Sequence, residues 1–97
     1  MTVIALLECS FKSERLDAGI DWLRGVLVAT RAFDGCLGVE VFEDHDDRSR
    51  VVVVEHWASL AHDRAYRAWR EGEGRIDGGD VFAHPPKLTV GEVRDGV

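Results

Sequence analysis

The run Arg-Val-Val-Val-Val-Glu-His-Trp at residues 50–57 contains four consecutive valines. β-Branched residues favour strands, and successive side chains of a strand point to opposite faces of the sheet. A run that is apolar at successive positions therefore predicts a strand buried on both faces, in the middle of a sheet. Residues 2–10 predict a second central strand, because both of their alternating sets of side chains are apolar.

Two shorter patterns predict the remaining strands. Residues 36–43 alternate between two sets of side chains, which are Leu37, Val39 and Val41 on one face and Gly38, Glu40 and Phe42 on the other. The polar residues 45–49 predict a hairpin loop between this strand and the valine-rich one. Residues 87–94 predict a last strand, after a loop over residues 75–86 that contains Pro85-Pro86.

The segment between the first two strands predicts an amphipathic helix from Glu14 to Ala32, with Ser13 as its N-cap. Its apolar stripe at helical spacing consists of Leu16, Ile20, Leu23 and Leu27. Gly19 and Gly25 weaken the helix locally without breaking the pattern. Gly35 suits the left-handed turn that ends it.

A second helix is expected to follow the valine-rich strand, from a cap at Ser59 to about Glu73. Three small residues at helical spacing predict its core side, where they would let the helix approach the sheet closely: Ala61, Ala65 and Ala68.

The order of elements is therefore β-α-β-β-α-β, which predicts an α+β fold of the ferredoxin-like type with a four-stranded antiparallel sheet. Right-handed crossovers place both helices on one face of that sheet. The two central strands are nevertheless apolar on both faces, so the uncovered face needs a partner. We expect a homodimer formed through this open sheet face.

Length and composition restrict the possible partners. The chain has 97 residues, which we interpret as one domain over residues 1–97. Its formal net charge is -6, so neither nucleic acid nor an anionic membrane surface is an expected partner. Cys9 and Cys36 form no CxxC pair and are expected to be reduced. The apolar segment at residues 1–7 is short, has no basic residue before it and is followed directly by Glu8. We therefore expect a cytoplasmic protein with no signal peptide.

Two segments resemble a known family. The stretch Thr-Arg-Ala-Phe-Asp-Gly-Cys-Leu-Gly-Val-Glu-Val, residues 30–41, resembles the x-x-PGxLGxEV segment of antibiotic biosynthesis monooxygenase domains. Glu-His-Trp-Ala-Ser at 55–59, followed by Ala61 and Ala65, resembles the E-x-W-x-S…A segment of the same family. Both segments fall in the family's order, on the expected elements. Where many members carry a histidine nine positions after the tryptophan, this chain has Tyr66.

The resemblance implies a dimeric α/β barrel, made of two ferredoxin-like sheets packed face to face. It also implies one of several activities, because members of the family differ in the reaction they catalyse. Some members oxidise polyketide anthrones to quinones with molecular oxygen and without a metal or flavin, and others degrade haem or isomerise small carbonyl compounds. Fold alone does not select among these activities.

One flank of the second helix carries the main candidates for chemistry. His62, Tyr66, Trp69 and Glu73 follow one another at spacings of four, three and four residues. Trp69 could stack on an aromatic substrate, while Tyr66 donates a hydrogen bond and His62 accepts a proton. The alternative is a helix edge whose amphipathic side chains reach towards water.

Further residues are candidates at lower rank. His56 is a second candidate catalytic residue, and Trp22, Trp57 and Phe42 are candidates for substrate binding. Trp57 is also interpreted as a core or interface anchor, and Trp22 as a partly exposed residue on the flank of its helix. His56 lies on the opposite strand face from Trp57. Glu40 is a candidate base that is more typical of a solvated or paired carboxylate, and His84 is interpreted as a surface residue in a loop.

We therefore expect a monooxygenase, independent of any cofactor, that oxidises a small electron-rich aromatic or polyketide-type molecule. The histidines do not stand at metal-ligand spacings, and no phosphate-binding glycine loop or nucleophile elbow is present in the sequence. One alternative is a non-catalytic binding or accessory dimer. Another is a polyketide isomerase or cyclase, which would use an acid–base pair such as Glu40 with His56.

Overall fold

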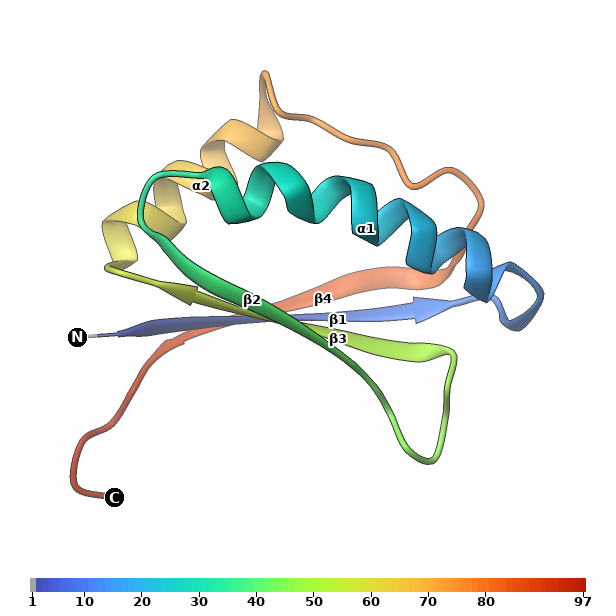
Figure 1. Ribbon diagram of the computed structural model, residues 1–97, viewed down its shortest axis with the longest axis horizontal. Helices are drawn as coiled ribbons and strands as arrows, with labels where there is room; N and C mark the ends of the chain where they lie inside the picture. The colour runs from blue at the N-terminus through green and yellow to red at the C-terminus, as the bar shows by residue number, and fades with distance from the viewer. Residues whose placement is uncertain (1) are drawn as a thin grey trace.

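The computed structural model describes residues 2–97 as one four-stranded sheet with two α-helices (Figure 1). The elements in chain order are β1 (Val3–Phe11), a short 3-10 turn (Ser13–Arg15), α1 (Leu16–Ala32), β2 (Cys36–Glu43), β3 (Arg50–Trp57), α2 (Leu60–Glu71) and β4 (Phe82–Glu92). The predicted β-α-β-β-α-β order and ferredoxin-like fold are confirmed.

The sheet has the strand order β2-β3-β1-β4, and all three strand pairs are antiparallel. β1 and β3 are therefore its central strands, as their apolar sequences predicted. Their register pairs Val3 with Trp57 at one end and Ser10 with Arg50 at the other.

Both helices cover the same face of the sheet (Figure 1). The odd-numbered residues of β1 and β3 point to this face, and they form the core together with the stripe of α1. Within that stripe Leu23 and Leu27 are buried, while Leu16 and Ile20 pack against the core from its margin. A second buried cluster under α2 contains Val3, Ala5, Trp57 and Tyr66.

The two predicted N-caps have different outcomes. The Ser59 hydroxyl accepts a hydrogen bond from the backbone N–H of His62 at 3.2 Å, so it caps α2. Ser13 does not cap α1, because a 3-10 turn precedes that helix and its N-cap is Arg15. Gly35 has φ +86°, in the left-handed region that the sequence predicted for the end of α1.

The predicted core side of α2 is wrong. Ala61, Ala65 and Ala68 are exposed, whereas Asp63 and Tyr66 are buried. A tyrosine ring removes much more apolar surface from water than an alanine methyl group, and its hydroxyl can be buried when it has hydrogen-bond partners. The helix therefore turns its tyrosine, and not its alanines, to the sheet.

The end of the chain also differs from the prediction. α2 ends at Glu71 and not at Glu73, and β4 begins at Phe82, within the segment predicted as a loop. Pro85 and Pro86 thus lie inside a strand. β4 is an edge strand, and an edge strand tolerates proline because its outer N–H groups need no partner within the sheet.

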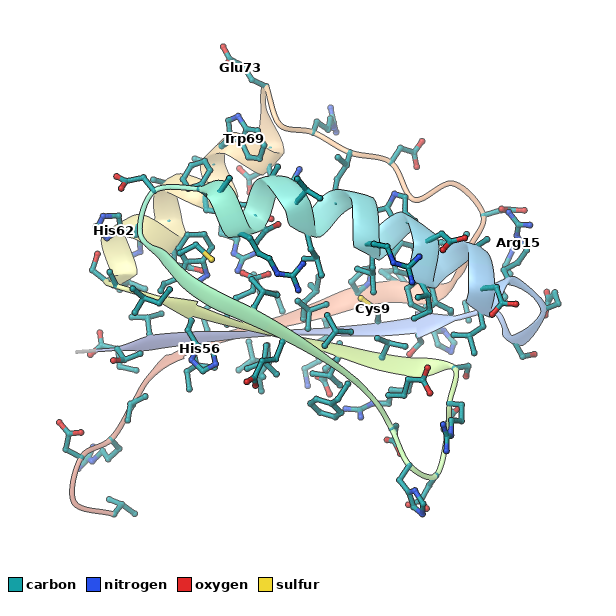
Figure 2. All side chains as sticks on the ribbon, viewed as in Figure 1. Cys9, Arg15, His56, His62, Trp69 and Glu73 are labelled. Atoms are coloured by element: carbon teal, nitrogen blue, oxygen red, sulfur yellow. The ribbon has the colours of Figure 1, made fainter. Side chains whose placement is uncertain are left out.

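The second face of the sheet carries no helix. It displays the even-numbered residues of β1, β2 and β3, and Figure 2 shows His56 pointing away from the helices. The apolar side chains on this face include Leu6, which is 36% exposed, and Phe42, which is 51% exposed.

Candidate functional site

A cavity of about 180 Å³ lies between the two helices and the covered face of the sheet. Its wall is mostly apolar but contains three charged side chains and one tyrosine. The lining residues are Leu7, Trp22, Leu23, Val26, Leu27, Glu55, Tyr66, Arg67, Arg70 and Ile76. This combination of an apolar wall with a few convergent polar groups is typical of a site for a small molecule.

Glu55 lies on β3 and contributes a buried carboxylate to this cavity. Alternation along the strand places it on the covered face together with Val53 and Trp57, and its side chain is 2% exposed. Its Oε1 accepts hydrogen bonds from Nε1 of Trp57 at 3.0 Å and from Nη2 of Arg67. A carboxylate at this depth stays charged at low cost only when it is paired in this way.

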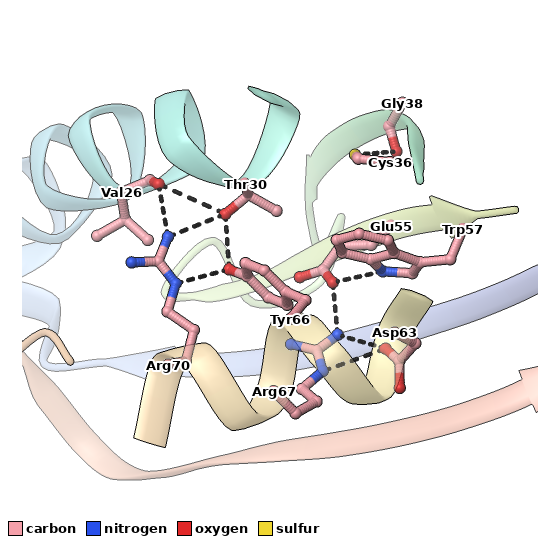
Figure 3. Close-up of polar contacts among 10 residues, drawn as sticks. All are labelled: Val26, Thr30, Cys36, Gly38, Glu55, Trp57, Asp63, Tyr66, Arg67 and Arg70. Atoms are coloured by element: carbon pink, nitrogen blue, oxygen red, sulfur yellow. Dashed lines mark hydrogen bonds and ion pairs between the residues drawn. The ribbon is translucent and has the colours of Figure 1, made fainter. Parts of the chain in front are cut away.

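The second carboxylate oxygen of Glu55, Oε2, makes no hydrogen bond with residues 2–97. All hydrogen bonds that residues 2–97 make to this side chain reach Oε1, and Figure 3 shows the other oxygen without a contact. The side-chain polar atoms of these residues that are fully shut off from solvent all have partners. Oε2 is therefore not fully shut off from solvent, and Glu55 is one of the residues that line the cavity.

Arg67, on α2, joins two buried acids. Its Nη2 donates to Glu55, and its Nε and Nη2 donate to Oδ1 of Asp63 at 3.2 and 3.1 Å. Asp63 lies one turn earlier on the same helix and is 2% exposed. One cation thus serves two carboxylates.

The hydroxyl of Tyr66 belongs to a chain of hydrogen bonds that ties α2 to α1 (Figure 3). It accepts from Nε of Arg70 at 2.8 Å and lies 2.7 Å from Oγ1 of Thr30. Nη2 of Arg70 also donates to the carbonyl oxygen of Val26 at 3.0 Å and to Oγ1 of Thr30 at 3.2 Å. These groups are already satisfied by one another, so they hold the two helices together at the cavity.

Trp22 and the loop after α2 form the outer end of the cavity. Nε1 of Trp22 donates to the carbonyl oxygen of Asp77 at 3.1 Å, and its ring is nearly perpendicular to the ring of Phe82, with the centroids 5.3 Å apart. The residue before Asp77 is Ile76, which is 43% exposed and also lines the cavity. The candidate Trp22 thus lies at the cavity, as part of its wall.

Tyr66 and Trp22 are the two sequence candidates that the structure brings to this cavity. Trp69 lies outside it, with its ring 5.4 Å from that of Phe33 and 4.6 Å from the guanidinium carbon of Arg70. Trp57 is fully buried in the core beneath, where it orients Glu55.

His62 lies at the beginning of α2, away from the cavity (Figure 2). Its Nδ1 is 2.7 Å from Oγ of the capping residue Ser59, and its Nε2 is 3.8 Å from the exposed carboxylate of Asp34. The spacing along α2 had grouped His62 with Tyr66. His62 is one turn before Tyr66, in the first turn of α2, and of these two residues only Tyr66 reaches the cavity.

His56 and Phe42 are on the uncovered face of the sheet, where Gly38 pairs with His56 and Phe42 pairs with Val52. Strand alternation keeps them on the side opposite the cavity. Glu40 shares this uncovered face and is exposed, and His84 is an exposed residue of β4, not of a loop.

Four residues of the cavity region were not among the sequence candidates: Glu55, Arg67, Arg70 and Thr30. A signal for Glu55 was present, because the alternation of β3 gives it the same face as Trp57. The signals for Arg67 and Arg70 were weak, since arginines on a helix are ordinarily solvated.

Cys9 lies on β1 under the helices and is fully buried (Figure 2). Burial, and to a smaller extent the nearby negative charge of Glu55, raise the pKa of its thiol to about 11. The thiol is therefore neutral and unreactive at ordinary pH. Cys9 and Cys36 are both free, as the sequence predicted.

Within residues 2–97 no three side chains of histidine, cysteine, aspartate or glutamate converge as metal ligands would. The same residues contain no helix with the length and apolar character needed to cross a membrane.

Comparison with known families agrees with the fold. A family model described as antibiotic biosynthesis monooxygenase matches residues 2–75. The chain belongs to the antibiotic biosynthesis monooxygenase family. No curated protein sequence matches it significantly.

Solved structures show the same fold over nearly the whole chain. A protein of Deinococcus radiodurans that carries the name of this family is 26% identical, with a TM-score of 0.82 over 98% of this chain and 95% of its own. The protein Rv0793 of Mycobacterium tuberculosis is 20% identical, with a TM-score of 0.79 over 98% of this chain and 97% of its own. The second likeness concerns the fold alone.

Proposed function

We propose that this protein oxidises a small electron-rich aromatic molecule, of the hydroquinone type, with molecular oxygen in the cavity between α1, α2 and the sheet. The proposal includes no metal or flavin, in keeping with the resemblance to family members that use neither. The observation that carries it is the apolar cavity with a buried carboxylate in its wall.

The size of the cavity favours a substrate with one ring. Sites for drug-sized ligands enclose about 300–1,000 Å³, whereas an engineered cavity of about 150 Å³ holds benzene. The 180 Å³ available here suits a single substituted ring better than the three fused rings of an anthrone. A hydroquinone is therefore the more suitable member of the expected substrate class.

The proposed reaction balances without another reductant. A hydroquinone and one O₂ give a hydroxyquinone and one water, so one oxygen atom enters the ring and the substrate supplies all four electrons. The protein has to remove a proton from the substrate, hold the electron-rich ring and keep bulk water out. The walls formed by Leu7, Leu23, Val26 and Leu27 supply the dry surroundings.

Oxygen consumption with hydroquinone tests this proposal, with the hydroxyquinone measured by its absorbance. A matched variant is Val26→Phe, which fills the cavity from α1 while its backbone carbonyl still accepts from Arg70. We expect the variant to fold and to lose the oxygen uptake of the wild type. Uptake that persists in the filled cavity contradicts this site, and no uptake by the wild type contradicts the reaction.

A non-catalytic binding protein is the second candidate, and one observation favours it. The hydroxyl of Tyr66 is engaged by both Thr30 and Arg70, so the expected hydrogen-bond donor is not free for a substrate. Tight binding of hydroquinone without oxygen uptake would support this alternative.

We also propose that the protein is a homodimer that associates through its uncovered sheet face. Leu6 and Phe42 stay exposed there in the single chain, although they belong to the apolar pattern of β1 and β2. Two such faces packed together would remove these side chains from water.

A further inference from the structure

We propose that Oε2 of Glu55 accepts the hydroxyl proton of the bound ring, and that this oxygen makes the cavity select an uncharged phenol. This inference rests on the cavity proposed above as the substrate site. It assigns the proton acceptor and a selection rule that the fold alone does not supply.

The first step of the argument is an inventory of free hydrogen-bonding groups in the wall. Arg67 is bound to Glu55 and Asp63, and Arg70 donates to Tyr66, Thr30, Val26 and Gly74. The hydroxyl of Tyr66 accepts from Arg70 and contacts Thr30. Oε2 of Glu55 and Nη1 of Arg67 have no hydrogen-bond partner among residues 2–97, so one acceptor and one neighbouring donor are left for a ligand, as a hydroxyl group requires.

The second step concerns charge. Glu55 and Asp63 contribute two negative charges, and Arg67 and Arg70 contribute two positive charges. A ligand that enters this balanced set without water gains most if it is neutral, because a further charge of either sign would lack a counter-ion. The free acceptor and the balanced charge together point to a ring with a neutral hydroxyl group.

The proton transfer itself is simple. The hydroxyl O–H bond breaks, the proton moves to Oε2 of Glu55, and the electron pair stays on the ring oxygen as a phenolate. Arg67 remains bonded to Oε1 throughout, and its positive charge favours the phenolate formed beside it. The phenolate is the electron-rich form that the proposed reaction with oxygen needs.

Binding measured by calorimetry without oxygen tests the selection rule separately from turnover. Four one-ring probes of similar size are phenol, toluene, benzylammonium and benzoate. A hydrogen bond to a charged acceptor is expected to make phenol bind about tenfold or more tightly than toluene. Toluene bound as tightly as phenol, or either ion bound more tightly, would overturn the proposal.

Glu55→Gln is the matched variant. Its amide oxygen can still accept from Trp57 and Arg67, which leaves an NH₂ donor facing the cavity. We expect the preference for phenol over toluene to fall about tenfold, and Glu40→Gln on the uncovered face to leave it unchanged. A preference that survives in Glu55→Gln contradicts the role of Glu55. If this variant does not fold, the four-probe series on the wild type decides alone.

The two proposals fail in different ways. Phenol selectivity without any oxygen uptake removes the oxidation and keeps the role of Glu55. Oxygen uptake that is equal in the wild type and in Glu55→Gln removes the role of Glu55 and keeps the oxidation.

Discussion

The guanidinium of Arg67 on α2 donates a hydrogen bond to the carboxylate of Glu55 on β3. The Glu55 side chain is 2% exposed and that of Arg67 is 22% exposed, so the pair lies at the inner wall of the cavity. It joins helix to sheet and orients the carboxylate at the same time. The stability of the fold and the chemistry of the site therefore depend on the same contact.

Arg67→Met should destabilise the protein strongly. Removal of the cation leaves Glu55 and Asp63 charged and buried, which costs about 3–5 kcal/mol for a broken buried pair. The control is Arg48→Met, because Arg48 pairs with Glu43 on the surface and such pairs contribute about 0–1 kcal/mol. Urea unfolding measures both. Equal losses of unfolding free energy in the two variants would show that the buried pair stabilises the fold no more than the surface pair does.

The two glycines of α1 should respond oppositely to alanine. A Cβ at Gly19 would lie 2.5 Å from Cδ1 of the buried Phe11 ring, whereas a Cβ at Gly25 meets no atom within 4 Å. Gly25→Ala should raise the free energy of unfolding by about 0.5–1 kcal/mol through helix propensity. Gly19→Ala should lower it by about 1–3 kcal/mol through overpacking. Thermal unfolding of both variants checks the sign, and stabilisation by Gly19→Ala would contradict the packing at Phe11.

Ser59→Ala should destabilise the protein and Ser13→Ala should not, because only Ser59 caps its helix in the structure. The Ser59 hydroxyl accepts from the backbone N–H of His62, so its loss should cost about 1 kcal/mol. Ser13 makes no cap hydrogen bond to α1, and its removal should change stability by less than about 0.5 kcal/mol. Chemical denaturation measures the difference. A cost at Ser13 as large as that at Ser59 would argue for a cap that the structure lacks.

Cys9 should make the protein less stable in alkaline solution. The pKa of its thiol is about 11 in the folded state against an ordinary value of 9.0, with burial as the main cause. The unfolded chain therefore loses this proton at lower pH than the folded chain. The stabilising contribution is complete below about pH 9 and is lost as the pH rises towards about 11.

Urea unfolding at about pH 8 and about pH 10.5 tests this dependence. Cys9→Ala should lose part of the alkaline decline that the wild type shows, and Cys36→Ala retains Cys9 as the control. The assignment fails when Cys9→Ala declines as steeply as the wild type.

Leu6→Asp should separate the proposed homodimer into monomers. Leu6 lies near the centre of the uncovered face, where a charge buried between two sheets would be unpaired. Light scattering after size exclusion measures the mass of each species. The control is Val28→Asp, on the exposed side of α1, which should leave the mass unchanged. A wild type that is monomeric, or a Leu6→Asp variant that remains dimeric, would rule out this interface.

Part of the site could be predicted from the sequence. Alternation along β3 gives Glu55 the same face as Trp57, and the helical spacing placed Tyr66 on a flank of α2. The rotation of α2 could not be predicted, because its three alanines and its tyrosine both offered an apolar surface. The larger burial of the Tyr66 ring, satisfied by Thr30 and Arg70, decided it.

The sequence predicted the element order, the central position of β1 and β3, and the membership of the family, because these follow from local periodicity and short motifs. It also determined the cap at Ser59 and the left-handed turn at Gly35, which depend on neighbouring residues alone. Only the tertiary structure decided which side chains meet at the cavity. Glu55 and Arg67 are twelve residues apart, and Thr30 and Arg70 are forty apart. Such contacts form only after the helices dock on the sheet, when burial makes each polar group find a partner.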